Sequence, residues 1–78
     1  MWTYVKDKLP VIPEGQMSVS CLVTLSTGHV MYAVFSKFWV KEGEFTDPSR
    51  YYASIDSDVY AWMYLPEPAE RTENGQVY

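Results

Sequence analysis

Cys21 and His29 are the residues that would permit nucleophilic catalysis, because an imidazole can take the proton of a thiol. The chain holds one cysteine and one histidine. Cys21 is in phase with Val19 and Val23 on the apolar side of a strand, where a thiol behaves as a small buried hydrophobe. His29 follows the turn residue Gly28, and no acid lies beside it in the sequence to orient its ring. We therefore predict that the protein is not an enzyme.

Paired carboxylates form the second pattern that could do chemistry, either general acid–base catalysis or the binding of a divalent cation. The stretch Asp56-Ser57-Asp58 fails the template of a calcium loop, because Tyr60 stands where a third ligand belongs and no glycine follows. We therefore expect no metal and no cofactor. We interpret the acids of this region as charges for contact with a protein. They are Glu42, Glu44, Asp47, Asp56 and Asp58.

Lys37, Trp39 and Lys41 form the one basic and aromatic cluster. If Phe38–Lys41 is a strand, these three side chains share one face and could stack a nucleic-acid base between two phosphate contacts. The alternative is an exposed strand face on which the lysine stems cover the tryptophan. Six basic against ten acidic residues give a net charge of -4, which disfavours binding to nucleic acid.

Tyrosine and tryptophan recur near the end of the chain, in a predicted last strand over Val59–Leu65. Strict alternation places Tyr60, Trp62 and Tyr64 on one face of this strand. Such side chains give large, rigid contact areas and are enriched at interface hot spots, so we assign these three as protein-binding anchors. The alternative is that the N-terminal arm covers them, with Trp2 and Tyr4 lying over the rings.

A β-hairpin is the clearest structural prediction. Val19, Cys21, Val23 and Leu25 alternate with polar residues, the stretch Ser26-Thr27-Gly28-His29 supplies a turn, and a strand over Val30–Phe35 follows with apolar residues on both faces. Asp47-Pro48 is typical of a helix start. Tyr51 and Ile55 are spaced to share a face of that helix. The fold class predicted is α+β and rich in β-structure, with an antiparallel sheet of three to four strands and at most one short helix.

The length of 78 residues, with 47% hydrophobic and 21% charged content, fits one small globular domain. We place this domain at residues 1–68 and expect residues 69–78 to be a flexible acidic tail. A single cysteine favours a reducing compartment. No apolar run is long enough to span a membrane, so we predict a cytoplasmic protein.

Two motifs resemble a family of small phage and prophage proteins classed only as a domain of unknown function. The first is Trp2-x-x-Val5-x-x-x-Leu9-Pro10, and the second is Trp62-Met63-x-Leu65-Pro66-Glu67-Pro68. The likeness spans about residues 2 to 68, although the loop from Thr46 to Ser57 is longer than is usual in that family. The resemblance implies a phage accessory gene in a bacterial host, and it implies no catalytic residue.

These observations favour a phage accessory protein that binds a host protein in the bacterial cytoplasm. Its concrete form is an anti-CRISPR or anti-restriction inhibitor, whose acids occupy a groove that normally holds nucleic acid in a defence complex. One alternative is a homodimeric structural or virion-assembly protein, because two of the predicted strands are apolar on both faces. The other is a single-strand nucleic-acid binder that uses Lys37, Trp39 and Lys41.

Overall fold

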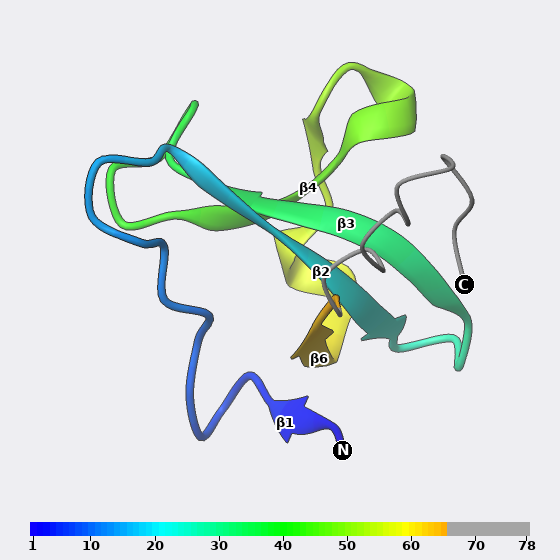
Figure 1. Cartoon of the computed structure of the whole chain (residues 1–78). Coiled ribbons are helices and arrows are strands. Elements are labelled where there is room, and N and C mark those ends of the chain that lie inside the picture. The colour runs from blue at the N-terminus through cyan, green and yellow to red at the C-terminus, as the bar shows by residue number, and fades with distance from the viewer. Residues whose placement is uncertain (66–78) are drawn as a thin grey trace, which may run out of the picture.

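Six antiparallel strands form one sheet in the computed structural model, which describes residues 1–65 (Figure 1). The spatial order of the strands is β1-β6-β2-β3-β4-β5. Single 3-10 turns precede β5 and β6. The elements are β1 (Thr3–Tyr4), β2 (Ser18–Leu25), β3 (Val30–Ser36), β4 (Glu44–Asp47), η1 (Pro48–Arg50), β5 (Ala53–Ser54), η2 (Asp56–Asp58) and β6 (Val59–Tyr64).

The predicted fold class is therefore wrong, because residues 1–65 form an all-β structure with no α-helix. Two of the six strands, β1 and β5, are only two residues long, and alternation cannot be detected over so short a stretch. The predicted helix is a single turn. The predicted boundary between a domain and a tail at residue 68 lies outside the described residues.

The hairpin of β2 and β3 is confirmed, with Val19 opposite Phe35 and Val23 opposite Met31. At its turn Gly28 takes a φ of 92°, a conformation that glycine adopts readily. The amide of Gly28 donates to the carbonyl of Leu25 at 2.8 Å. Both β3 and β6 have neighbouring strands on two sides.

The third strand does not lie where the sequence predicted it. Phe38–Lys41 is a loop, and β4 begins at Glu44. Gly43 explains the shift, because its φ of 93° turns the chain directly against the ring of Phe35. The chain then runs back along β3, and Phe45 packs edge-on against Phe35 with their centroids 4.9 Å apart.

The predicted helix start is correct in its cap and wrong in its length. The carboxylate of Asp47 accepts hydrogen bonds from the amide and the hydroxyl of Ser49 at 3.0 and 2.6 Å. The turn ends after Arg50 because Tyr51 and Tyr52 adopt left-handed backbone, with φ of 56° and 58°. The next residues pair with β4 as β5, so the segment closes a hairpin instead of continuing as a helix.

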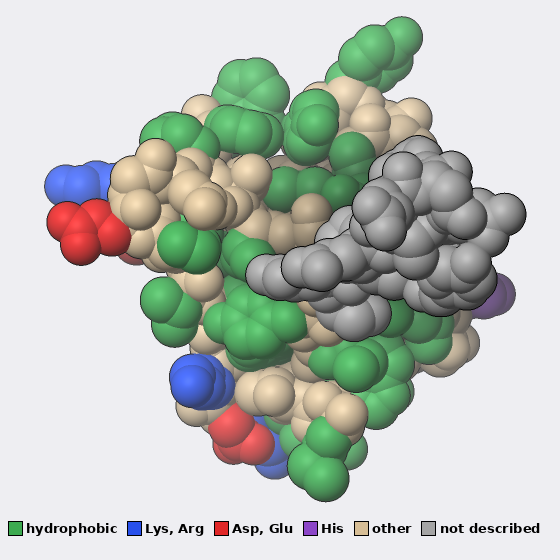
Figure 2. All heavy atoms as spheres, in the orientation of Figure 1, with side chains coloured by type: hydrophobic (Ala, Val, Ile, Leu, Met, Phe, Trp, Pro, Cys, Tyr) green, Lys and Arg blue, Asp and Glu red, His purple; other side chains and the backbone are tan. Residues whose placement is uncertain are grey.

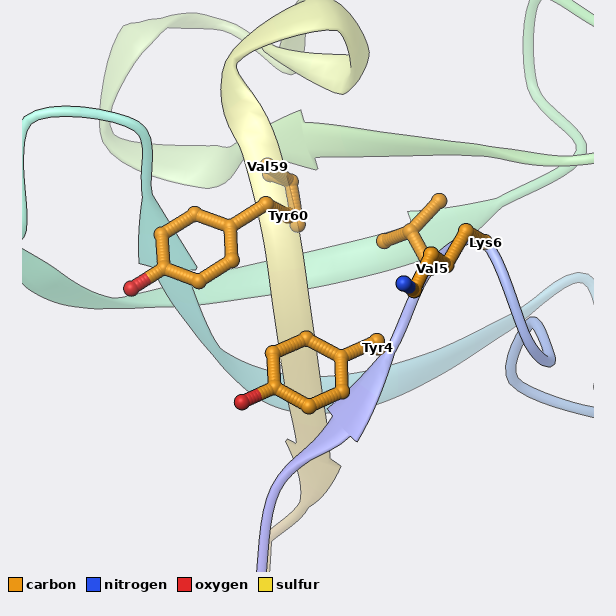
Figure 3. Close-up of a pocket in the computed structure, with 5 residues that line it drawn as sticks. All are labelled: Tyr4, Val5, Lys6, Val59 and Tyr60. Carbon is orange, nitrogen blue, oxygen red and sulfur yellow. The ribbon is translucent and has the colours of Figure 1, made fainter.

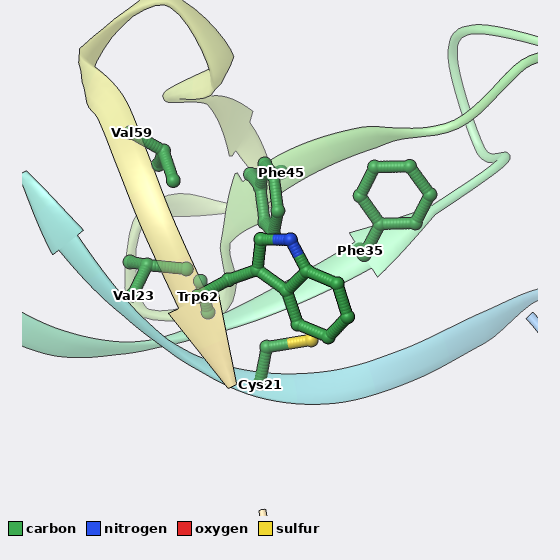
Figure 4. Close-up of a cluster of buried hydrophobic side chains, with 7 residues drawn as sticks. Cys21, Val23, Phe35, Phe45, Val59 and Trp62 are labelled. Atoms are coloured by element: carbon green, nitrogen blue, oxygen red, sulfur yellow. The ribbon is translucent and has the colours of Figure 1, made fainter. Parts of the chain in front are cut away.

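A β-bulge in β6 interrupts the alternation predicted for the last strand. Leu25 pairs with Val59 but Thr24 pairs with Ala61, so Tyr60 is an extra residue without a partner. Val59 and Trp62 consequently point into the same core, as Figure 4 shows. The buried cluster comprises Cys21, Val23, Ala33, Phe35, Phe45, Val59 and Trp62.

The N-terminal arm crosses the apolar face of the sheet, as the sequence predicted. The indole Nε1 of Trp62 donates to the carbonyl of Lys8 at 2.8 Å. The amide of Val11 donates to the hydroxyl of Tyr64 at 2.9 Å. Val5 and Ile12 pack against the core cluster. The arm thus takes the place of a covering helix.

Gly43→Ala should destabilise the fold more than Gly28→Ala. A Cβ at position 43 would lie 2.5 Å from Cε2 of Phe35, whereas a Cβ at position 28 meets nothing within 4 Å. The φ values of Gly43 and Gly28 are nearly equal, at 93° and 92°. Gly28→Ala therefore measures the cost of the backbone strain alone. We expect Gly28→Ala to cost about 1–2 kcal/mol and Gly43→Ala about 1–3 kcal/mol more. Urea unfolding followed by tryptophan fluorescence measures both, and equal losses would contradict the contact with Phe35.

Candidate protein-binding surface

Cys21 is fully buried and is not placed for nucleophilic chemistry. Burial raises the pKa of its thiol to about 11, opposed in part by a hydrogen bond from the backbone of Phe35. His29 lies exposed in the turn after β2, where its Nδ1 is 2.9 Å from the hydroxyl of Thr27. The thiol is in the core and the imidazole is on the surface, so this pair cannot act as a dyad.

The five acids assigned to protein contact differ in their surroundings. Glu44 and Asp47 are buried, and Asp47 is engaged as the cap of η1. Asp56 is exposed, but its Oδ1 accepts a hydrogen bond from the amide of Phe45 at 3.1 Å. Glu42 and Asp58 are exposed. Among residues 1–65, no three His, Cys, Asp or Glu side chains are grouped so that they could hold a metal ion.

The three aromatic residues assigned as anchors do not form one exposed face. Trp62 is only 2% exposed and packs edge-on against Tyr64, with centroids 4.8 Å apart. Tyr64 and Tyr60 are about half exposed. The bulge separates Tyr60 from the other two, and its ring lies beside that of Tyr4. Trp62 therefore belongs to the core, and its indole N–H donates to the carbonyl of Lys8 in the N-terminal arm.

A second group of aromatic side chains is more exposed than the predicted one. We call Phe38, Trp39, Tyr51 and Tyr52 the aromatic corner. The indole Nε1 of Trp39 donates to the carbonyl of Tyr52 at 3.0 Å, which ties the loop after β3 to the loop after β4. Phe38 packs edge-on against Tyr52, with centroids 5.4 Å apart. Trp39 nevertheless remains 68% exposed and Tyr51 95% exposed.

Backbone strain supports a functional assignment of this corner. A non-glycine residue with left-handed backbone costs about 1–2 kcal/mol, and here two tyrosines in succession adopt it. Tyr51 occupies the position after a helical turn, where glycine is the usual residue. Its ring gains almost no burial in return. Strain that packing does not explain is typical of binding sites.

Charged residues flank the aromatic corner on both loops. Lys37, Lys41 and Arg50 are exposed there, together with the acid Glu42. Sequence reasoning named Trp39 and the two lysines but missed Tyr51 and Arg50. It placed Tyr51 on one face of a helix with Ile55, so no feature of the pattern marked this ring as exposed.

Apolar side chains are spread over the face shown in Figure 2, whereas charged side chains lie toward the edges of that view.

No helix within residues 1–65 has the length and apolar character needed to cross a lipid bilayer. No family model, curated protein or solved structure matches this chain. The resemblance to phage proteins therefore stays a prediction from its two motifs.

The thiol of Cys21 should resist alkylation in the folded protein. A pKa of about 11 in place of 9.0 lowers the thiolate fraction at pH 8 about 100-fold, and burial blocks the reagent as well. Iodoacetamide labelling at pH 8, followed by mass spectrometry, should be slow without urea and fast in 8 M urea. Stability should be undiminished below pH 9 and should fall between pH 9 and 11, because only the unfolded chain releases the proton readily there. In Cys21→Ala this fall in stability between pH 9 and 11 should be absent. If the free energy of unfolding of the variant fell with pH as steeply as that of the wild type, the Cys21 thiol would not be its cause.

Trp62→Phe should loosen the N-terminal arm. The variant loses the hydrogen bond to Lys8 and part of a buried ring, for a cost of about 2–3 kcal/mol. Limited proteolysis should then cut within residues 5–17 sooner than in the wild type. Trp39→Phe is the matched control, since its ring is 68% exposed and its loss should cost under about 1 kcal/mol. Equal effects of the two variants would show that Trp62 does not hold the arm.

Proposed function

We propose that this chain is a non-enzymatic, phage-encoded accessory protein that binds a bacterial host protein through its aromatic corner. The binding residues of highest weight are Trp39, Arg50 and Tyr51. Tryptophan, tyrosine and arginine are the three residue types most enriched at interface hot spots. The observation that carries the proposal is Tyr51, a 95% exposed ring on strained backbone.

The geometry of the corner favours a protein as the partner. Its rings are fixed by the Trp39–Tyr52 hydrogen bond and by the packing of Phe38, so binding orders few side chains. Of the acids assigned to mimicry of nucleic acid, Glu42, Asp56 and Asp58 are exposed. We propose that these three supply the charge that competes for a defence complex in the host cytoplasm, whereas Glu44 and Asp47 act within the fold.

Single-strand nucleic-acid binding is the second candidate, favoured by one observation. Trp39 lies exposed in the same loop as the exposed Lys37 and Lys41, and Arg50 lies in the neighbouring loop. A stacking ring beside basic groups suits an unpaired base. The net charge of -4 opposes this reading at physiological salt.

Affinity capture from nuclease-treated bacterial lysate tests the proposed function. The bait proteins are the wild type, Trp39→Ala/Tyr51→Ala, and Tyr32→Ala as a control that removes an exposed tyrosine elsewhere. We expect one host protein that the wild type and the control retain and the double variant loses. Retention by all three would contradict the assignment of the corner.

Salt-sensitive binding of the wild type to oligothymidine, lost in the double variant, would support the second candidate. Capture of this chain alone would indicate a homodimer.

Tyr51→Gly should separate binding from stability. Glycine relieves the left-handed strain and no packing is lost, so the free energy of unfolding should stay equal or rise by up to about 1 kcal/mol. Capture of the partner should nevertheless fall at least about tenfold. Tyr52→Gly is the matched control: it relieves similar strain but removes the contact with Phe38, so its stability should fall. A Tyr51→Gly variant that is stabilised and binds normally would show that the ring has no part in recognition.

A further inference from the structure

An apolar surface lies on the side of the sheet that faces away from the core cluster. Leu22 of β2 pairs with Tyr32 of β3 and with Met63 of β6, so these three side chains form a row across the sheet. Tyr4 of β1 pairs with Ala61, which lies two residues from Met63 and so on the same side. We call the exposed and half-buried apolar side chains of this side the outer face. They are Tyr4, Leu22, Val30, Tyr32, Tyr60 and Met63.

Tyrosine rings supply most of the outer face. Tyr4, Tyr32 and Tyr60 are 49%, 44% and 45% exposed, and Val30 is 55% exposed. The rings of Tyr4 and Tyr60 lie side by side at the β1 end, with their centroids 6.3 Å apart and planes that differ by 17° (Figure 3). At the β3 end, the hydroxyls of Tyr32 and Ser20 are 3.1 Å apart, a hydrogen bond that orients the Tyr32 ring. The rings are therefore oriented before any partner binds.

The strands that carry the outer face have no charged residue. The sequences of β1, β2, β3 and β6 contain neither acid nor lysine nor arginine on either side of the sheet. On the outer side, the next strand along is β4, whose Glu44 is buried. An exposed apolar surface without charge, rich in tyrosine, has the composition of the centre of a protein interface.

We infer that the outer face is the interface of a homodimer, in which it packs against the same face of a second copy. Apolar sheet faces pack about 10 Å apart, with the side chains of both faces interdigitated. A second copy presents such a face, with the same row of side chains from β3, β2 and β6. A two-fold axis brings the two rows together in one self-complementary contact.

Electrostatics selects a second copy over a charged partner. Each chain has a net charge of -4, so contact between two copies through their charged surfaces sets like charges against each other. The outer face is where two copies can meet without opposing acids. A nucleic acid is disfavoured there, because the four strands offer no cation to its phosphates.

The area of the outer face sets the strength of this dimer. A fully covered tyrosine buries about 150–250 Å², so three half-exposed rings offer about 300 Å². Leu22, Val30 and Met63 bring the face to about 500 Å² in each copy, or about 1,000 Å² in the dimer. A specific interface needs about this area at least. We therefore expect reversible association at micromolar concentrations and not an obligate dimer.

Sedimentation equilibrium of the full chain tests the inference. We expect a monomer at about 5 µM, a dimer at about 1 mM and a dissociation constant of about 100 µM. Raising NaCl from about 50 mM to about 300 mM should tighten the dimer, because salt screens the repulsion between two acidic copies. An interface built on ion pairs would instead weaken with salt.

Two valines provide a matched pair of variants. Val30→Glu should weaken the dimer at least about tenfold, because the two-fold axis buries two carboxylates without partners. Val11→Glu makes the same change of charge at a valine that is 62% exposed and lies outside the outer face. Its dissociation constant should stay within about twofold of the wild type. Trp39→Ala should dimerise normally, which separates this inference from the proposed function.

Isotope-filtered NMR on a mixture of labelled and unlabelled wild type maps the interface without any substitution. We expect contacts between copies at Leu22, Tyr32 and Met63. Three results would overturn the inference. The first is a wild type that stays monomeric at about 1 mM. The second is a folded Val30→Glu variant that dimerises as tightly as Val11→Glu. The third is contacts between copies that lie outside the outer face.

Discussion

The burial of Trp62 beneath the N-terminal arm is the interaction on which the other features depend. A lone sheet must cover its apolar face, and residues 1–65 contain no α-helix that could do so. The indole is 2% exposed, and its N–H is satisfied by the carbonyl of Lys8. Because Trp62 lies on β6 between β1 and β2, it fixes the arm to the centre of the core. The same attachment holds β1, and therefore Tyr4, in register.

Regular parts of the fold could be predicted from the sequence, and its irregular parts could not. The hairpin of β2 and β3 follows from alternation and a turn glycine, and the structure confirms it. The predicted strand positions and faces were wrong where a single residue interrupts the alternation of apolar and polar side chains. Gly43 displaces β4 from Phe38–Lys41, and the bulge at Tyr60 reverses the faces of the strand that follows. A period of two carries no information about an inserted residue.

The candidate site was predictable only in part for the same reason. Trp39 was named from its lysine neighbours, and it is exposed. Asp47 was named twice, as a cap and as a surface charge, and its role as a cap is the reason why it is buried. Tyr51 was missed because Asp47-Pro48 predicts a helix, whereas left-handed backbone ends the turn three residues later. Two tyrosines in that conformation are not a pattern that propensity favours.

The exposed aromatic surfaces at both ends of the strand order arise from such irregularities, and this shared origin argues for function. A bulge places Tyr60 beside Tyr4, and left-handed backbone places Tyr51 in solvent. The bulge also directs Val59 and Trp62 into the same core, whereas the left-handed backbone at Tyr51 adds no side chain to that core. Natural sequences break local rules mainly where a site requires it. Packing does not account for the left-handed backbone at Tyr51, because its ring stays 95% exposed, and recognition of a partner is the explanation that we propose for it.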